Sequence, residues 1–119
     1  APRTHNSGHH TIEGNVCSQF EQHLRTVLNL PLGDTAPLHP ASAMLNLIGE
    51  PNAQGTPVYE GLEEVLTLPN VHVHLYGKST VKPHRKMGHA TVTGPDIASV
   101  QRDVLKLRAM LKVCGSNQD

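Results

Sequence analysis

The sequence predicts an α/β (α+β) fold, with a small mixed or antiparallel sheet and about three helices. The chain has 119 residues, which suits one compact domain with a single hydrophobic core. Hydrophobic residues make up 37% of it, with no Trp, one Phe and two Tyr, so the core must be mostly aliphatic. Apolar residues alternate with a period of two in some segments and recur every three or four residues in others. These are the patterns of strands and helices.

The first predicted helix follows Ser18. Ser18 and Glu21 form a capping box, in which each side chain satisfies a free backbone N–H at the start of a helix. The apolar face of this helix comprises Phe20, Leu24, Val27 and Leu28. Pro31 and Gly33 are expected to end it.

The middle of the chain predicts a strand and a second helix. Residues 41–50 form a short apolar run between Pro40 and Gly49, which is typical of a buried strand. Residues 56–66 predict a helix, because Thr56 suits the cap and Pro57 the first helical position. Its inward residues are expected to be Val58, Leu62, Val65 and Leu66.

The last part of the chain predicts two strands and a third helix. Residues 71–77 alternate strictly, with Val71, Val73 and Leu75 on one face and His72, His74 and Tyr76 on the other. Residues 88–94 predict a second short strand, and loops are expected before residue 18 and between these two strands. After Pro95, an apolar stripe gives the clearest helix pattern in the chain; it comprises Ile97, Val100, Val104, Leu107 and Leu111.

The charge balance excludes several kinds of function. Ten basic and ten acidic residues cancel, so no overall field draws the chain to nucleic acid or to a membrane. No apolar run approaches the roughly 18 residues that span a bilayer, and no signal peptide is visible. Cys17 and Cys114 lack metal-type spacing, so we expect two free thiols in a cytoplasmic protein.

Two segments concentrate side chains that bind anions or move protons. Residues 1–11 contain Arg3, His5, Asn6, Ser7, His9 and His10. Residues 77–89 contain four of the ten basic residues, namely Lys78, Lys82, Arg85 and Lys86. Arg offers a bidentate fork and Lys a flexible point charge, so this basic loop is a candidate site for phosphate or another multivalent anion. A solvated surface loop explains the same composition equally well.

The nine histidines raise the possibility of a metal site. His5 and His9 form one pair and His72 and His74 another, but neither pair has a carboxylate beside it, and there is no His-Glu-x-x-His motif or Cys pair. We therefore expect no native metal site, and most of the histidines to be polar surface or hydrogen-bonding residues. Cys17 has no assignable Asn or Asp partner, so we expect no nucleophilic role for it.

Five segments resemble the C-terminal part of a family of ATP-grasp ligases, the 5-(carboxyamino)imidazole ribonucleotide synthases. They are APRTHNSGHHTIEG, SQFEQHLRTVLNLPLGD, AMLNLIGE, VHLYGK and RKMGHATVTG, and they run in family order over nearly the whole chain. The resemblance implies that residues 1–40 are the end of the ATP-grasp domain, with an active-site loop and a helix. Residues 41–114 would be a small C-terminal α/β domain, and residues 115–119 a polar tail.

The resemblance also implies a carboxylation step in purine biosynthesis. ATP and bicarbonate would form carboxyphosphate, whose carboxyl group passes to the amine of aminoimidazole ribonucleotide, and ADP and phosphate would leave. The implied catalytic residues are Arg3, His5, Asn6, Ser7 and His9, with His9 as a proton carrier. The residues implied to hold the 5′-phosphate of the ribonucleotide are Lys78, Arg85 and Lys86.

Three departures from the family pattern matter. His10 stands where the family usually has Trp, and His84 stands where the basic loop usually has Gly. The family's metal-binding carboxylate and ATP-binding lysines lie upstream of residue 1. Because the chain also starts without Met and inside a motif, we expect a fragment that lacks most of the ATP and Mg²⁺ site and is inactive alone.

Several partners and alternatives follow from these observations. The implied partners are aminoimidazole ribonucleotide, the rest of the ATP-grasp chain, a second copy in a homodimer, and a fused or separate mutase domain. One alternative is a non-catalytic module that binds phosphorylated ligands through Lys78 and Arg85, and another is a His-rich metal-binding or scaffolding domain. A third is the sibling formate-dependent glycinamide ribonucleotide transformylase. That family typically has His-Asp-Thr-Gly where residues 5–8 are His-Asn-Ser-Gly.

Overall fold

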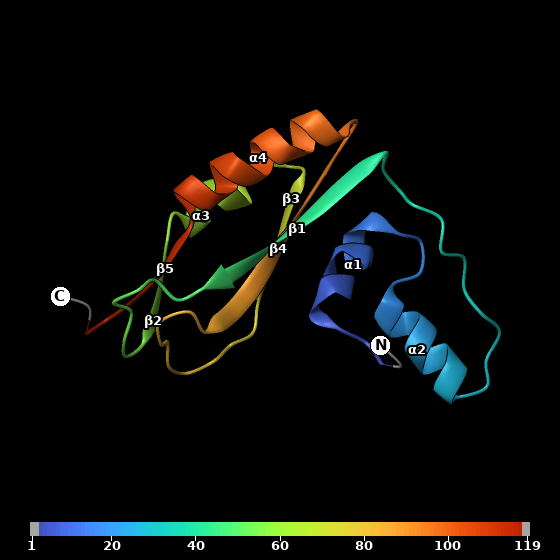
Figure 1. Cartoon of the computed structure of the whole chain (residues 1–119), viewed down its shortest axis with the longest axis horizontal. Coiled ribbons are helices and arrows are strands. Elements are labelled where there is room, and N and C mark those ends of the chain that lie inside the picture. Colours follow the sequence, from blue (N-terminus) through green and yellow to red (C-terminus); the bar gives the residue numbers. More distant parts are fainter. Residues whose placement is uncertain (1–2, 118–119) are drawn as a thin grey trace.

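The computed structural model describes residues 3–117 and confirms an α/β fold with small antiparallel sheets. In chain order the elements are the 3₁₀ helix η1 (Asn6–His10), α1 (Thr11–Gly14), α2 (Gln19–Val27), β1 (Ala41–Ile48), β2 (Pro57–Glu60), α3 (Leu62–Leu66), β3 (Val71–Leu75), β4 (Lys86–Gly94), α4 (Ile97–Met110) and β5 (Lys112–Gly115). Figure 1 shows α4 on one side of β1 and β4, and α1 on the other side.

The main sheet has three antiparallel strands in the order β1-β4-β3. The strands predicted at residues 41–50, 71–77 and 88–94 are therefore confirmed. The pairing register places His89 of β4 between Asn46 of β1 and His74 of β3. Since side chains alternate across a strand, these three residues share one face of the sheet.

The other face of the sheet carries the hydrophobic core under α4. Ala90 and Val92 of β4 are fully buried, and Val100 and Leu107 of α4 are 2% and 0% exposed. The helix predicted after Pro95 is thus confirmed, and it starts where Asp96 Oδ1 accepts a hydrogen bond from the Ser99 N–H at 2.7 Å. Ile97, in the first turn, departs from the expected stripe, because its side chain is 68% exposed.

The helix predicted for residues 56–66 is wrong in its first half. Pro57–Glu60 forms β2, which pairs with Lys112–Gly115 in a second antiparallel sheet, and only Leu62–Leu66 is helical. Gly61 separates the two parts with φ of +82°, and a Cβ on it would lie 2.1 Å from the Met110 carbonyl oxygen. A left-handed glycine in close contact with the backbone ends a helix. Residues 57–60 therefore form a strand, because they pair with a distant segment of the chain.

Strand β5 was not predicted from the sequence. It includes Gly115, which was assigned to the polar tail, so the tail that the structure describes is the turn at Ser116 and Asn117. Residues 118 and 119 of the predicted tail lie outside the described residues. The boundary at residue 40 coincides with the start of β1 at Ala41, and the division into domains stays a prediction.

The helix predicted after Ser18 is confirmed, and Ser18 Oγ accepts a hydrogen bond from the Glu21 N–H at 3.0 Å. It ends at Val27, earlier than Pro31, because the chain turns through Asn29 with φ of +55°. Its predicted apolar face is mostly exposed, at 59% for Leu24 and 66% for Val27. Packing against the described residues therefore does not explain this apolar face.

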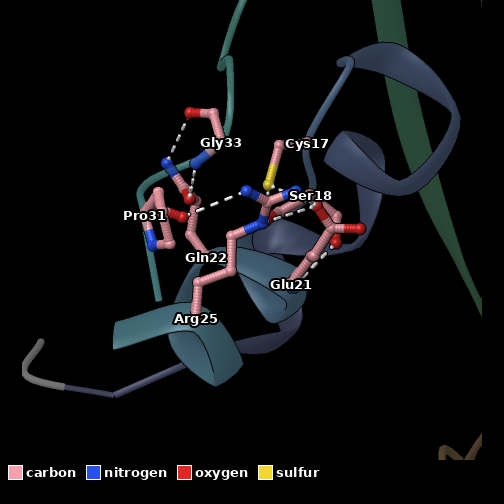
Figure 2. A network of polar contacts seen from close by, with 7 residues as sticks. All are labelled: Cys17, Ser18, Glu21, Gln22, Arg25, Pro31 and Gly33. Atoms are coloured by element: carbon pink, nitrogen blue, oxygen red, sulfur yellow. Dashed lines mark hydrogen bonds and ion pairs between the residues drawn. The ribbon is translucent and has the colours of Figure 1, made fainter. Parts of the chain in front are cut away.

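Figure 2 shows how a polar network holds the turn after α2 against that helix. Glu21 Oε2 accepts hydrogen bonds from Cys17 Sγ at 3.0 Å and from Arg25 Nε at 3.1 Å. The side-chain amide of Gln22 bonds both the N–H and the carbonyl oxygen of Gly33. Two causes raise the pKa of the Cys17 thiol: the hydrogen bond to Glu21, which has the larger effect, and burial. Both cysteines are free thiols, as predicted, and Cys17 is buried within this network.

Candidate functional site

Residues 6–14 cover the polar face of the main sheet. The sequence predicted a loop here, but these residues form η1 and α1. Asn6 Nδ2 donates a hydrogen bond to Asn46 Oδ1 of β1 at 3.0 Å. Gly14 lies so close to Ser42 of β1 that a Cβ would meet its Oγ at 3.0 Å. The N-terminal segment is therefore fixed on the sheet by side chains that the strand pattern places on its polar face.

His5 is the N-cap of η1 and has a defined tautomer. Its Nδ1 accepts a hydrogen bond from the Ser7 N–H at 3.2 Å and lies 3.0 Å from Ser7 Oγ. Gln19 Oε1 of α2 accepts a hydrogen bond from the His5 N–H at 3.0 Å. Because Nδ1 is an acceptor, a neutral His5 carries its proton on Nε2. Arg3, His5 and Ser7 are all exposed, so their donors can reach a ligand.

Three imidazole rings from distant parts of the chain form a histidine stack of His9, His89 and His74. The ring centroids of His9 and His89 lie 4.2 Å apart with an interplanar angle of 6°. Those of His89 and His74 lie 4.6 Å apart at 17°. Phe20 of α2 closes the outer end of the stack on His9, with centroids 5.3 Å apart. The central ring, that of His89, is only 2% exposed.

Polar groups meet the histidine stack along its edge and at its inner end. The Tyr76 hydroxyl lies 3.0 Å from His89 Nδ1 and 3.4 Å from His9 Nδ1, so one hydroxyl bridges two imidazoles. His74 Nε2 contacts Glu13 Oε1 of α1. His89 Nε2 and Glu13 Oε2 are buried and have no hydrogen-bond partner among residues 3–117. The stack is thus a polar cluster held between η1, α1, β3 and β4.

Burial, more than any other cause, keeps His9 and His89 uncharged at neutral pH. Burial, and then the charges of His9 and His74, lower the pKa of His89 to about 4. Burial also lowers the pKa of His9, with further effects from His74, Lys86 and His5. Burial raises the pKa of Tyr76, which keeps its hydroxyl proton. The Tyr76 hydroxyl can therefore donate its proton to one of these two neutral imidazoles and accept an N–H from the other.

The basic loop starts and ends beside this cluster. Tyr76 leads into it, and Lys78 Nζ lies 5.8 Å from the Tyr76 ring centroid. Lys78 Nζ also donates a hydrogen bond to the Lys86 carbonyl oxygen, which closes the base of the loop. Arg85 Nη1 instead donates to the carbonyl and Oγ1 of Thr80, both at 3.1 Å, within the loop itself. His84, in the turn just before β4, has φ of +63°, the left-handed conformation that glycine adopts most easily.

The structure brings most of the candidate residues to one side of the main sheet. Those in the N-terminal segment are Arg3, His5, Asn6, Ser7 and His9, and those at the base of the basic loop are Lys78 and Lys86. Arg85 lies in the same loop, with its guanidinium on Thr80. Their assignment as site residues stays a prediction.

Sequence reasoning missed His89, Tyr76, His74 and Glu13 as members of this cluster. The alternation at residues 71–77 did place His74 and Tyr76 on one face, but it assigned no partner to them. The same alternation in β4 puts His89, Thr91 and Thr93 on one side and Ala90 and Val92 on the other. The sequence therefore shows which residues of β4 share a face. It does not show the register between β3 and β4, which brings His74 and His89 together.

The described residues lack a donor set for a resident metal ion. Within residues 3–117, no group of three or more His, Cys, Asp or Glu side chains is arranged to hold one. The structure therefore does not fit a Mg²⁺ site built from these residues alone. In the same range, no helix combines the length and the apolar character needed to cross a membrane.

Known proteins resemble this chain over almost all of its length. The N5-carboxyaminoimidazole ribonucleotide synthase of Pseudomonas aeruginosa is 46% identical over 112 residues, which are 94% of this chain and 28% of that protein. The crystal structure of N5-carboxyaminoimidazole ribonucleotide synthetase from Thermotoga maritima covers 98% of this chain at 48% identity and a TM-score of 0.92. The corresponding synthase of Aspergillus clavatus, solved with ADP and 5-aminoimidazole ribonucleotide, covers 90% at 42% identity and a TM-score of 0.76.

The chain spans less than a third of the length of each of these proteins, at 28%, 32% and 28%. A family model, described as the phosphoribosylaminoimidazole carboxylase C-terminal domain, matches residues 42–103. The match covers more than half of the sequence, including β1, β3, β4 and the start of α4. The chain therefore belongs to the phosphoribosylaminoimidazole carboxylase C-terminal domain family.

Proposed function

We propose that this chain forms the C-terminal part of a ligase that carboxylates aminoimidazole ribonucleotide, using bicarbonate and ATP. The observation that carries the proposal is the match to the Thermotoga maritima synthetase over 98% of the chain, with 48% identity and a TM-score of 0.92. The Aspergillus clavatus structure supports the substrate class, because it was solved with ADP and 5-aminoimidazole ribonucleotide. The products would be 5-(carboxyamino)imidazole ribonucleotide, ADP and phosphate.

In this proposal the N-terminal segment acts on the carboxyl group being transferred. A bicarbonate oxygen attacks the γ-phosphorus of ATP, ADP leaves, and carboxyphosphate forms. The substrate amine then attacks the carboxyl carbon, phosphate leaves with the C–O bonding electrons, and the amine loses a proton. Arg3 and the Nε2–H of His5 are exposed donors for the anionic oxygens, as charge develops on them. His9 accepts the proton, because its lowered pKa leaves the ring neutral at pH 7.

Asn6 and Ser7 have secondary roles in the proposal. One amide hydrogen of Asn6 is used by Asn46, so its carbonyl oxygen and second N–H remain for substrate. Ser7 sets the orientation of His5 through its N–H and hydroxyl. We propose that Lys78, Lys86 and Arg85 hold the 5′-phosphate of the ribonucleotide, with Arg85 turning from Thr80 toward the ligand.

ATP and Mg²⁺ are proposed to bind mainly to chain outside these residues. The donor set within residues 3–117 does not fit a metal ion, whereas the related proteins are three to four times as long. A homodimer, a fused or separate mutase domain and a cytoplasmic location are further predictions of the same proposal.

A chimera tests the proposal directly. The 119 residues are fused behind the part of the Thermotoga maritima synthetase that precedes its matched segment, and ADP and carboxylated product are measured. We expect turnover that requires both bicarbonate and aminoimidazole ribonucleotide. Arg3→Ala in the chimera should lower kcat by roughly a hundredfold, the usual cost of one transition-state donor. The exposed Arg102 of α4 provides the control, since Arg102→Ala should leave kcat unchanged.

The opposite outcomes have clear meanings. Binding of the ribonucleotide without turnover in a folded chimera would favour a non-catalytic module for phosphorylated ligands. Formate-dependent turnover of glycinamide ribonucleotide would favour the sibling transformylase.

A further inference from the structure

His89 occupies a position between the two halves of the proposed site. On one side its ring stacks on His9, in the segment that carries Arg3 to Ser7. On its edge, Nδ1 lies 3.0 Å from the hydroxyl of Tyr76, the residue that leads into the basic loop. Within residues 3–117, His89 is the almost fully buried side chain that contacts both His9 and Tyr76. His89 itself is too buried to bind a ligand.

We propose that His89 is a positioning residue, which fixes η1 and the base of the basic loop relative to each other. This inference rests on the proposed function, since it names the residue that joins its two groups of binding side chains. We call the two contacts of His89 its joints. The first joint is the stack on His9, which holds η1 on the sheet together with the hydrogen bond from Asn6 to Asn46. The hydrogen bond to Tyr76 is the second joint, and it holds Lys78 close to β4 through the Tyr76 ring.

The charges around His89 explain why both joints need the neutral ring. His9 of η1, His74 of β3 and Glu13 of α1 are the titratable groups that affect it, and Lys86 of β4 and His5 act on His9. A proton on His89 would face two imidazoles at 4.2 Å and 4.6 Å, one of them already under the influence of Lys86. It would also make Nδ1 a donor, so the Tyr76 oxygen would have to accept and its hydroxyl proton would have to turn away from His89. Protonation therefore changes both contacts of His89 together.

Two substitutions separate the joints. His89→Phe keeps a ring for His9 but loses the hydrogen bond to Tyr76, whereas His89→Asn keeps an acceptor near the position of Nδ1 but loses the stacked ring. Hydrogen exchange of the 119-residue chain reports each joint. The Gly8 amide, bonded to the His5 carbonyl oxygen at 2.9 Å, reports η1. The Tyr76 amide, bonded to the Met87 carbonyl oxygen at 3.0 Å, reports the base of the loop.

We expect opposite patterns from the two variants. His89→Asn should speed exchange at Gly8 by roughly twofold to tenfold, the worth of one aromatic contact, and leave Tyr76 unchanged. His89→Phe should speed exchange at Tyr76 by roughly fivefold, the worth of one hydrogen bond, and leave Gly8 unchanged. The Val92 amide in the core of β4 reports global unfolding. Its exchange rate should change only as far as the free energy of unfolding of each variant, measured with denaturant, changes. His72→Asn and His72→Phe are matched controls, because His72 lies on the same sheet face and makes no stacking contact in the described chain.

The chimera then separates positioning from stability. His89→Asn should lower kcat, because η1 carries the groups that act on the carboxyl carbon, and His89→Phe should raise KM for the ribonucleotide. The inference would be overturned if the exchange rates of Gly8 and Tyr76 in both variants equalled those of the wild type. It would also be overturned if exchange at Gly8, Tyr76 and Val92 rose by the same factor. If the wild-type chimera shows no turnover while the exchange patterns separate as expected, the proposed function fails and the two joints of His89 stand.

Discussion

The neutral state of His89 makes the stability of the chain depend on pH in a predictable way. The pKa of its ring is about 4 in the folded chain, against 6.5 as the ordinary value. Between these two values the unfolded chain binds the proton more tightly than the folded chain does. The stabilisation is therefore fully present above about pH 6.5 and is lost as the pH falls toward 4. The whole difference corresponds to roughly 3 kcal/mol, of which about 2 kcal/mol is lost between pH 7 and pH 5.

Urea unfolding of wild type and His89→Phe, followed by circular dichroism at several pH values, measures this effect. Phe cannot be protonated, so the variant should lose about 2 kcal/mol less than wild type between pH 7 and pH 5. At pH 7 the variant loses the Tyr76 hydrogen bond but also removes a buried Nε2 that has no partner in the described structure, and these two changes oppose each other. His72→Phe, on the same sheet face, is the matched control for exchanging an imidazole for a benzene ring. Identical pH slopes for wild type and His89→Phe would refute the reasoning.

Three further predictions concern the turn before β4, the last helix and the buried thiol. His84→Gly should raise the free energy of unfolding in urea by about 1 kcal/mol, because the φ of +63° strains a residue with a Cβ. His84→Ala should give no gain, and equal effects of Gly and Ala would speak against backbone strain. Asp96→Ala should cost about 1 kcal/mol through loss of the cap on Ser99, and Asp96→Asn should retain the stability; a loss in both variants would point to charge instead. Cys17 should react with iodoacetamide at pH 8 more slowly than glutathione, and Glu21→Gln should accelerate it; a fast wild-type reaction would contradict the raised pKa.

Local patterns predicted those elements whose state depends on their own residues. The alternation at 71–77, the apolar run at 41–50 and the stripe after Pro95 each describe one face of an element, and each was confirmed. Residues 57–60 show the limit of this approach. Thr56 and Pro57 fit the start of a helix, but pairing with Lys112–Gly115, more than fifty residues away, makes the segment a strand. A four-residue strand such as β5 has no pattern long enough to detect.

The candidate site shows the same division between local and distant information. The density of polar groups in residues 3–9 and in the basic loop was visible in the sequence, because each group lies within a few positions. The histidine stack combines rings at positions 9, 74 and 89, and its geometry depends on the register of β3 and β4 and on the placement of η1. Neither follows from spacing along the chain. Residue His89 could therefore be placed in a polar strand face, but its role between the two segments required the fold.

The KM for aminoimidazole ribonucleotide in the chimera tests the central claim most directly. Lys78→Ala and Arg85→Ala remove charged donors proposed to hold the 5′-phosphate, and each should raise KM by roughly tenfold to a hundredfold, the cost of one charge-assisted hydrogen bond. Lys106→Ala and Arg102→Ala, on the exposed side of α4, should leave KM at the wild-type value. A KM that is unchanged in the Lys78 and Arg85 variants, and equal to that of their controls, would contradict the account.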